Sequence, residues 1–421
     1  MLVFKFGGAS VKNAVSVKNL FSILNKYTDN QIIVVVSAMG KITSALESIL
    51  DKYFNKSDFK SDFDILKNFH LDIISELFED DYSDIYSDFN LLISELENRL
   101  SINPSSSYDY EYDQIVSFGE IFSTKIVSEY LKFMHIKNEW IDIRKFLKTD
   151  SIYRDAKINW ELSERLLKNE IDFTQQKIYL TQGFIASNQN NNVTTLGREG
   201  SDFTAAVLAY VFDAEKLIIW KDVEGVFNSD PNEYKDVIKL DSISFTEAVE
   251  LAYYGAKIIH PKTIKPLQNK NIVLEVKSFK NPEKQGTIIS NSTENNLGVS
   301  PNVPIYIAKN NQILISIAPR DFSFIAEENL SNIFYVLAKY RVKVNLLQNS
   351  AVSFSICVDY DKNKVDAALS ELNQDYKVLY NLNLTLITIR HYDSEIINEM
   401  TNKRKIFVQQ KSRHTARFVV D

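Results

Sequence analysis

The stretch Gln31-Ile32-Ile33-Val34-Val35-Val36 contains five consecutive β-branched residues with no polar residue between them. Such a run is typical of a strand that is buried on both faces of a parallel sheet. Similar runs occur at residues 177–181, 216–220 and 271–276, and helical patterns occur at 15–25 and 203–212. Strands that alternate with helices predict an α/β fold: three layers, with helices covering both faces of a mainly parallel sheet.

The chain of 421 residues is long enough for two or three domains. We expect residues 1–290 to form one domain that carries a helical arm at 51–113. In the arm, apolar residues recur three and four positions apart, at Ile65, Phe69, Ile73 and Leu77.

The pattern changes after residue 291, where the order of elements becomes β-α-β-β-α-β, a ferredoxin-like unit. A partial copy follows that lacks an opening strand, and residues 304–308 can supply one from upstream. We therefore expect two interleaved modules within 300–421, the first at 311–382 and the second at 302–310 plus 383–421.

Composition excludes several classes of protein. The net charge of -7 argues against a nucleic-acid-binding surface. The longest apolar run, Ala205 to Phe212, is well short of a membrane span. The single cysteine, Cys357, is expected to be a buried core residue in a reducing compartment, and no signal peptide is visible, so we expect a cytoplasmic protein. Five scattered histidines predict no metal site built by the protein.

Glycine marks the candidate site, because only 11 residues of the chain are glycine. Gly7 and Gly8 follow the first predicted strand and come two and three residues after Lys5. Backbone N–H groups at a helix start, beside an ammonium group, suit phosphate oxygens. The segment is not a Walker A loop, and no dinucleotide-binding fingerprint is present, so P-loop kinases and Rossmann dehydrogenases are disfavoured.

A second glycine pair, Gly197 and Gly200, encloses Arg198 just before a helical stretch. Ser201 or Asp202 could simply be the N-cap of that helix. An arginine on a loop that permits close approach suits bidentate capture of a carboxylate or a phosphate, and we favour this interpretation.

Taken together, seven segments resemble the aspartate kinases, in the order and spacing of that family. They are Lys5 to Ser10, Val36 to Lys41, Ser117 to Glu120, Gly197 to Asp202, Lys221 to Phe227, Asp230-Pro231 and Gly255 to Pro261. The resemblance covers the whole chain, including a tail similar to paired ACT modules. It implies an amino-acid-kinase fold, with ATP and L-aspartate side by side over the strand ends.

The same resemblance implies phosphoryl transfer from ATP to the β-carboxylate of L-aspartate, the first step towards lysine, threonine and methionine. By motif position, Lys5 would stabilise the transferring phosphoryl group and Asp202 would orient the lysine. Arg198 would hold the α-carboxylate and Glu120 the α-ammonium group of aspartate. The other expected substrate-binding residues are Ser37, Thr43 and Ser201.

Along the nucleotide the resemblance places Lys5, Gly7, Gly8, Lys221, Asp222, Phe227, Asn232, Lys257 and Ile258. The β-carboxylate of aspartate is already ionised at neutral pH, so the reaction needs no general base. It needs positive charge around an anionic transition state, which lysines, backbone amides and a Mg²⁺ ion brought with ATP would provide.

The chain departs from the usual family pattern at several positions. Ala9 stands where many members have threonine, Glu199 where many have glycine, and Asn232 where a basic residue is frequent. In the tail, Asn345 and Ala351 occupy places where lysine-sensitive relatives have carboxylates. An amino-acid effector is therefore a hypothesis, whereas a homodimer through the ACT modules is the expectation.

Two alternatives remain open. One is a kinase of the same fold that acts on another carboxylate, and the other is a catalytically inactive paralogue that senses amino acids by binding. The double tail and the Ser117–Glu120 segment count against the first, and the presence of Lys5 and Asp202 counts against the second. From the length and the missing dinucleotide loop, we expect no fusion with homoserine dehydrogenase.

Overall fold

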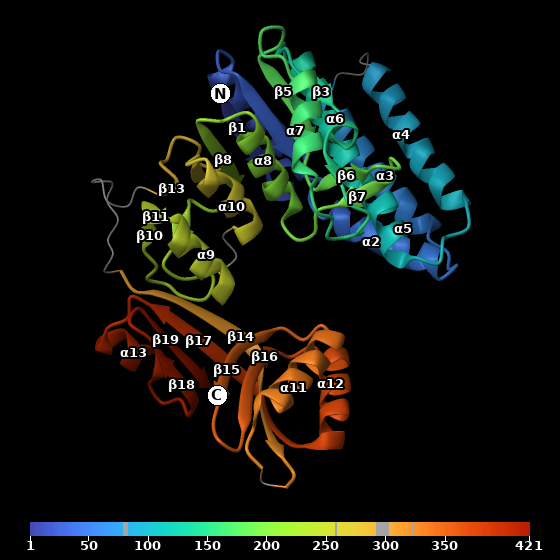
Figure 1. Ribbon diagram of the computed structural model, residues 1–421. Helices are drawn as coiled ribbons and strands as arrows, with labels where there is room; N and C mark the ends of the chain where they lie inside the picture. The colour runs from blue at the N-terminus through green and yellow to red at the C-terminus, as the bar shows by residue number, and fades with distance from the viewer. Residues whose placement is uncertain (79–82, 257–258, 292–302, 322) are drawn as a thin grey trace. The chain divides into compact units, whose positions relative to one another are not determined.

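The computed structural model describes residues 1–78, 83–256, 259–291, 303–321 and 323–421 (Figure 1). The chain divides into two compact units. The first contains Met1–Val226, Lys239–Ala252 and Lys257–Val299, and the second contains Phe227–Ile238, Tyr253–Ala256 and Ser300–Asp421. Among the described helices, none combines the length and the apolar character that crossing a membrane requires.

The first unit is built on an eight-stranded sheet with the order β11-β13-β12-β8-β1-β2-β5-β3. Its strands are β1 (Leu2–Phe6), β2 (Ile32–Val36), β3 (Glu139–Ile141), β5 (Ile178–Gln182), β8 (Lys216–Lys221), β11 (Ser242–Ser244), β12 (Val273–Ser278) and β13 (Thr287–Ser290). All neighbours are parallel except β12 and β13. Every residue of β2 is buried, so the expectation of a mainly parallel sheet with both faces covered is confirmed.

Helices form a layer on each face of this sheet. On one face lie α1 (Ala14–Leu24) and α6 (Phe118–Phe133), and the arm extends their core. The other face carries α8 (Gly200–Val211), which packs on β1, β2 and β8 and is flanked by α7 (Trp160–Glu170) and α10 (Pro261–Asn269). Because side chains alternate along a strand, Phe4 and Phe6 enter the first core while Lys5 faces α8. The alternation of side chains along β1 therefore places Lys5 on the face of the sheet that α8 covers.

The arm consists of α2 (Ile42–Phe54), α3 (Lys60–Leu77), α4 (Ser83–Ser101) and α5 (Tyr108–Val116). The expected stripe on α3 was partly wrong, because Ile65 is 65% exposed. The buried stripe contains Phe63, Leu66, His70 and Ile73 instead. Both sets of residues have the spacing of three and four positions that a helical stripe requires. Because His70 is polar, the sequence did not indicate that it belongs to the buried stripe.

Three short strands, β4 (Lys148–Thr149), β6 (Ile185–Asn188) and β7 (Val193–Thr195), form a small sheet beside the main one. This small sheet lies between α5 and the loop that leads into α8, since β7 packs against α5 and ends five residues before α8 begins. The first unit also contains the segment Lys239–Ala252, which includes β10 (Lys239–Leu240) and α9 (Phe245–Tyr254) as far as residue 252.

The second unit contains a six-stranded antiparallel sheet with the order β15-β16-β14-β17-β19-β18. The strands are β14 (Ile305–Pro319), β15 (Val344–Asn349), β16 (Phe354–Asp359), β17 (Tyr376–Arg390), β18 (Ile406–Lys411) and β19 (Thr415–Val420). They are covered by α11 (Glu327–Lys339), α12 (Lys362–Asp375) and α13 (Ser394–Thr401). These elements agree with the ferredoxin-like pattern expected for ACT modules.

One feature of this sheet differs from the expected pattern. The opening strand expected at 304–308 and the first strand of the module at 311–382 are both parts of β14, and the last strand of that module and the first strand after residue 383 are both parts of β17. Residues Ile305–Lys309 pair with Leu386–Arg390, whereas Gln312–Pro319 pair with residues 376–384. The polar residues between the two halves resembled turns, but the ladder absorbs them as register shifts after Lys309 and Gln312.

Candidate active site

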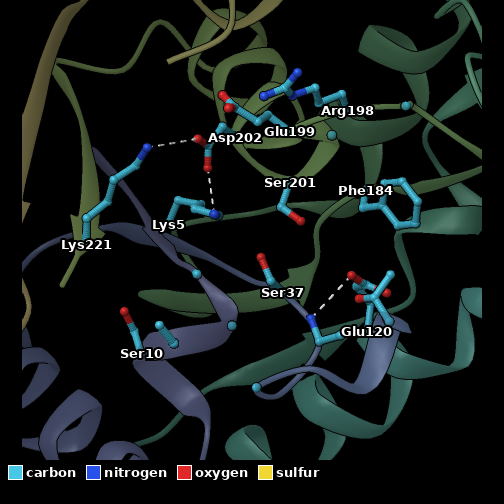
Figure 2. Close-up of a pocket in the computed structure, with 18 of the residues that line it drawn as sticks. Lys5, Ser10, Ser37, Glu120, Phe184, Arg198, Glu199, Ser201, Asp202 and Lys221 are labelled. Atoms are coloured by element: carbon cyan, nitrogen blue, oxygen red, sulfur yellow. Dashed lines mark hydrogen bonds and ion pairs between the residues drawn. The ribbon is translucent and has the colours of Figure 1, made fainter. Parts of the chain in front are cut away.

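A cavity of about 550 Å³ opens at the carboxyl ends of β1, β2 and β8, next to the start of α8 (Figure 2). Most of the expected site residues line it: Lys5, Gly7, Gly8, Ser37, Thr43, Glu120, Arg198, Ser201, Asp202, Lys221 and Asp222. Phe227 and Asn232 belong to the second unit. Lys257 and Ile258 lie outside the described residues. The cavity thus brings together side chains from five separate sequence segments.

Lys5, Lys221 and Asp202 form a charged cluster on one side of the cavity. The Nζ atom of Lys5 lies 2.6 Å from Oδ1 of Asp202, and that of Lys221 lies 4.0 Å from Oδ2 (Figure 2). Burial alone would raise the pKa of Asp202, but the two ammonium groups outweigh burial and lower it. Asp202 is therefore an ionised carboxylate that orients two cations at the start of α8.

The loop after β1 passes very close to the loop after β2. A Cβ atom on Gly8 would lie 2.7 Å from the carbonyl oxygen of Ala38, so a larger residue cannot be placed there without moving main-chain atoms. The N–H of Gly40 donates to the carbonyl of Gly8 over 3.0 Å. The close packing leaves a lining of main-chain atoms and Lys5, which suits a phosphate group.

Glu120 lies in the first turn of α6, on the opposite side of the cavity from Asp202 (Figure 2). It is 3% exposed, and its Oε1 accepts a hydrogen bond from the N–H of Ala38 over 3.2 Å. Its Oε2 has no hydrogen-bond partner among the described residues. Burial raises the pKa of Glu120 to about 8, although the Ala38 amide and Lys5 oppose the shift. A buried carboxyl with an uncommitted oxygen suits an amine ligand.

The loop with Arg198 connects β7 to α8 and is held from outside by Asp113. This buried carboxylate accepts hydrogen bonds from the N–H of Thr195 at 2.9 Å, from its hydroxyl at 2.7 Å and from the N–H of Arg154 at 3.1 Å. Burial raises the pKa of Asp113 to about 6, and the hydrogen bonds work against that rise. Asp113 thereby ties the ends of two loops that both line the cavity.

Several lining residues were not expected from the sequence: Ser10, Tyr112, Arg154, Phe184 and Trp220. Arg154 has a left-handed φ of 66°, and its guanidinium group lies over the ring of Tyr112, 4.3 Å from the ring centre. Neither residue belongs to a glycine-marked motif. Trp220 could have been found, because it is the last residue of the strand predicted at 216–220 and lies next to Lys221.

Comparison with known proteins agrees with this architecture. Residues 1–278 match the model of the amino acid kinase family. The chain is 30% identical over 372 residues to the lysine-sensitive aspartokinase 3 of Escherichia coli, covering 85% of this chain and 78% of the relative. It is 28% identical over 386 residues to a chloroplastic bifunctional aspartokinase/homoserine dehydrogenase of Arabidopsis thaliana, and the match spans 42% of that longer protein.

Solved structures give the same result over the full length. The structure of E. coli aspartokinase III with lysine and aspartate matches with a TM-score of 0.83 and 26% identity. The structure of that enzyme with aspartate and ADP matches with a TM-score of 0.82. Both matches cover 100% of this chain and 96% of the solved chain. The chain therefore belongs to the amino acid kinase family and, within it, to the aspartokinases.

Proposed function

We propose that this chain is an aspartate kinase, which transfers the γ-phosphoryl group of ATP to the β-carboxylate of L-aspartate and forms 4-phospho-L-aspartate. The observation that carries the proposal is the opposed arrangement in one cavity. Lys5, Lys221 and Asp202 lie on one side, and the buried Glu120 with its uncommitted oxygen lies on the other. An amino acid with a free amine and a phosphoryl donor would fit between them.

The chemistry requires alignment of two anions rather than proton abstraction. The β-carboxylate of aspartate has a reference pKa of about 3.9, so it is a ready nucleophile at neutral pH. Lys5 would place an ammonium group beside the transferring phosphoryl group, where a loose transition state spreads negative charge. Glu120 would bind the α-ammonium group and Arg198 the α-carboxylate, which leaves the β-carboxylate directed towards Lys5.

The remaining residues of the cavity would complete the two subsites. Ser37, Thr43 and Ser201 would line the substrate side, and Gly7, Gly8, Lys221 and Asp222 the phosphate side. We extend the nucleotide subsite to Phe227, Asn232, Lys257 and Ile258, which the family resemblance assigns to it. The co-crystallised ADP and aspartate of the E. coli relative support this division into two subsites.

A divalent cation such as Mg²⁺ fits the phosphate side of the cavity. Oε2 of Glu199 is buried there and has no hydrogen-bond partner among the described residues. An oxygen of this kind is the donor that Mg²⁺ prefers. When bound, the ion would neutralise charge on the phosphate oxygens of the nucleotide. Lys5, Lys221 and Asp202 would still position the transferring group.

For assembly and regulation we propose a homodimer through the ACT modules of the second unit, in the cytoplasm. The place expected for an effector carboxylate holds Asn345, whose amide donates to Gln312 and Asp359 over 2.9 and 3.0 Å. Because this side chain is committed within the sheet, an amino-acid effector would need other ligands. Turnover measured with added lysine and threonine, singly and together, tests this proposal, and flat curves would discard it.

The function is tested by an ATPase-coupled assay with aspartate, glutamate and N-acetylglutamate as acceptors. We expect turnover with aspartate, and hydroxylamine should trap the acyl phosphate. A Lys5→Ala variant is expected to lose turnover while keeping the melting temperature within a few degrees. A preference for N-acetylglutamate would contradict the assignment of Glu120, since that acceptor has no free amine, and normal turnover by Lys5→Ala would contradict the role of Lys5.

A further inference from the structure

Glu199 stands out among the residues of the cavity. It immediately precedes α8 and has φ 55° and ψ 30°, in the left-handed region. Glycine adopts this conformation freely, whereas a residue with a side chain adopts it at a cost. A glutamate at such a position therefore needs a reason beyond the path of the backbone.

Glu199 lines the cavity as a half-buried residue, and one oxygen of its carboxylate is buried there. This oxygen, Oε2, has no hydrogen-bond partner among the described residues. Figure 2 shows this carboxylate on the Asp202 side of the cavity, away from Glu120. A buried anionic oxygen without a partner is costly, so the position is complete only when a ligand supplies positive charge.

The neighbouring carboxylate is already committed. Asp202 has one oxygen 2.6 Å from the Lys5 ammonium nitrogen and the other 4.0 Å from that of Lys221. Glu199 thus provides an uncommitted carboxylate oxygen on the phosphate side of the cavity. A nucleotide phosphate alone would be repelled by it, and the substrate amine is expected at Glu120. A hard divalent cation that is bound to phosphate oxygens would supply the positive charge that Glu199 lacks and would remove its repulsion of the phosphate.

The backbone around Glu199 is held tightly. A Cβ atom on Gly197 would lie 2.8 Å from Oδ1 of Asp155, and one on Gly200 would lie 2.7 Å from Cδ2 of Phe184. Both glycines therefore sit against neighbouring residues, so the backbone of the two residues between them, Arg198 and Glu199, is constrained at both ends. A carboxylate on such a fixed loop is preorganised to act as a ligand.

We propose that Glu199 donates a carboxylate oxygen to the divalent cation that accompanies the nucleotide, with phosphate oxygens and water as the other ligands. The inference rests on the proposed kinase function. It adds a metal ligand that the sequence pattern did not predict, since the sequence predicted no metal site built by the protein.

The test measures direct binding of Mn²⁺ to the full-length chain in the presence of ADP. Binding is monitored by electron paramagnetic resonance, in which the signal of free Mn²⁺ falls as the ion binds. Glu199→Gln keeps the shape of the side chain and removes its charge. We expect its Mn²⁺ dissociation constant to rise about tenfold or more, as loss of support at metal sites typically does. The matched control is Glu97→Gln on the exposed side of α4, which should bind Mn²⁺ like the parent chain.

A second variant guards against misfolding. Glu199→Gly relieves the left-handed backbone and should melt no lower than the parent chain, yet it should show the same weakened Mn²⁺ binding. Unchanged Mn²⁺ binding in both variants would overturn the inference. So would a raised KM for aspartate with intact Mn²⁺ binding, because Glu199 would then serve the substrate. In either case turnover of aspartate by the parent chain would leave the proposed function standing.

Discussion

At the scale of single residues, two buried carboxyl groups in one cavity have opposite protonation tendencies. Burial dominates at Glu120 and raises its pKa to about 8, whereas Lys5 and Lys221 overcome burial at Asp202 and lower its pKa. At neutral pH the cavity without ligands therefore holds Glu120 mostly protonated and Asp202 ionised. Binding of an α-ammonium group must release the proton from Glu120.

The pH dependence of substrate binding follows from this release. Because only ionised Glu120 attracts the ammonium group, kcat/KM for aspartate should rise about tenfold per pH unit below the pKa and level off near pH 8. The measurement is a steady-state profile from pH 6 to 9 at saturating ATP. Glu120→Gln should give a lower value with no inflection near pH 8. A parent profile that is flat between pH 6 and 8 would contradict the assignment.

Asp113 gives a second prediction, this one about positioning. Asp113→Asn replaces a buried carboxylate that accepts hydrogen bonds from three donors by an amide, so an N–H group must face N–H donors. We expect a loss of about 1–3 kcal/mol in the free energy of unfolding. We also expect a higher KM for aspartate with a smaller change in kcat, because the loop of Arg198 loses its anchor. Denaturant unfolding and steady-state kinetics measure the two effects.

The matched control is Asp109→Asn, which alters an exposed carboxylate 3.2 Å from the guanidinium group of the same Arg154. Exposed ion pairs contribute little, so this variant should lose less than about 1 kcal/mol and keep its KM. Equal effects of the two substitutions would show that the guanidinium contact, rather than the buried anchor, fixes the loop.

The same residues show what the sequence could and could not predict about the site. Lys5, Arg198 and Asp202 were predicted because each lies within two residues of a glycine, in a segment that resembles the aspartate kinases, and such segments are visible in the sequence. Tyr112 and Arg154 come from the arm and from a loop without glycine. They reach the cavity only through the tertiary packing that Asp113 organises, so no local pattern could predict them.

At the scale of elements, α3 contains a buried histidine. Burial lowers the pKa of His70 to about 4, while its Nδ1 lies 2.8 Å from the carbonyl of Leu66. Its ring packs against those of Phe89 and Phe122, with ring centres 5.5 and 5.2 Å away. The folded arm therefore requires a neutral imidazole.

The sign of the resulting pH dependence is fixed by the direction of the shift. A folded-state pKa below the unfolded value of 6.5 means that the unfolded chain binds a proton that the folded chain does not bind. The stabilisation by neutral His70 is complete above pH 6.5 and is lost as the pH falls towards 4. At pH 5 the loss amounts to about 2 kcal/mol.

The measurement compares the parent chain with His70→Leu in thermal unfolding at pH 7 and pH 5. The parent chain should lose more stability between these values than the variant, which has no imidazole to protonate. His414→Gln changes an exposed histidine and should behave like the parent chain. An equal loss in His70→Leu would place the acid sensitivity elsewhere in the chain.

Predictability of the elements depended on how much of the pattern is local. The β-branched run of β2 predicted a doubly buried strand, because only such a strand tolerates continuous apolar residues. By contrast, the sequence predicted two separate strands in place of β14, and two in place of β17, because a polar stretch lies within each of them. Asn311 and Asn383 have left-handed φ values of 54° and 58°, which usually mark turns. Pairing between the two long strands keeps them continuous, and this pairing lies beyond a local window.

At the scale of the whole molecule, two segments from the first three hundred residues fold with the C-terminal sheet. In the second unit the N–H of Tyr306 donates to the carbonyl of Asn228 over 2.9 Å, and the rings of Tyr306 and Tyr234 lie 4.9 Å apart. The ring of Tyr254 lies under the guanidinium group of Arg417 at 5.0 Å. The first of these segments carries Phe227 and Asn232.

The second segment, Tyr253–Ala256, ends where Lys257 begins. Gly255 has φ 113°, and a Cβ atom there would lie 2.2 Å from Cε of Lys309, whose ammonium group donates to Asn345 over 3.0 Å. Gly255→Ala must therefore strain the backbone by about 1–3 kcal/mol and displace the half-buried Lys309. If this strain reaches Lys257, ADP should bind about tenfold more weakly, since 1.4 kcal/mol corresponds to a factor of ten.

A double variant separates the two causes. Lys309→Ala removes the obstructing side chain but leaves the positive φ, so Gly255→Ala with Lys309→Ala should recover part of the ADP affinity measured by calorimetry. Lys309→Ala alone loses its bond to Asn345 but leaves Gly255 unstrained, so it should bind ADP nearly as the parent chain does. Parental affinity in Gly255→Ala would mean that the segment tolerates the strain without passing it to Lys257. The contact between Gly255 and Lys309 would then stabilise the second unit without influencing the nucleotide.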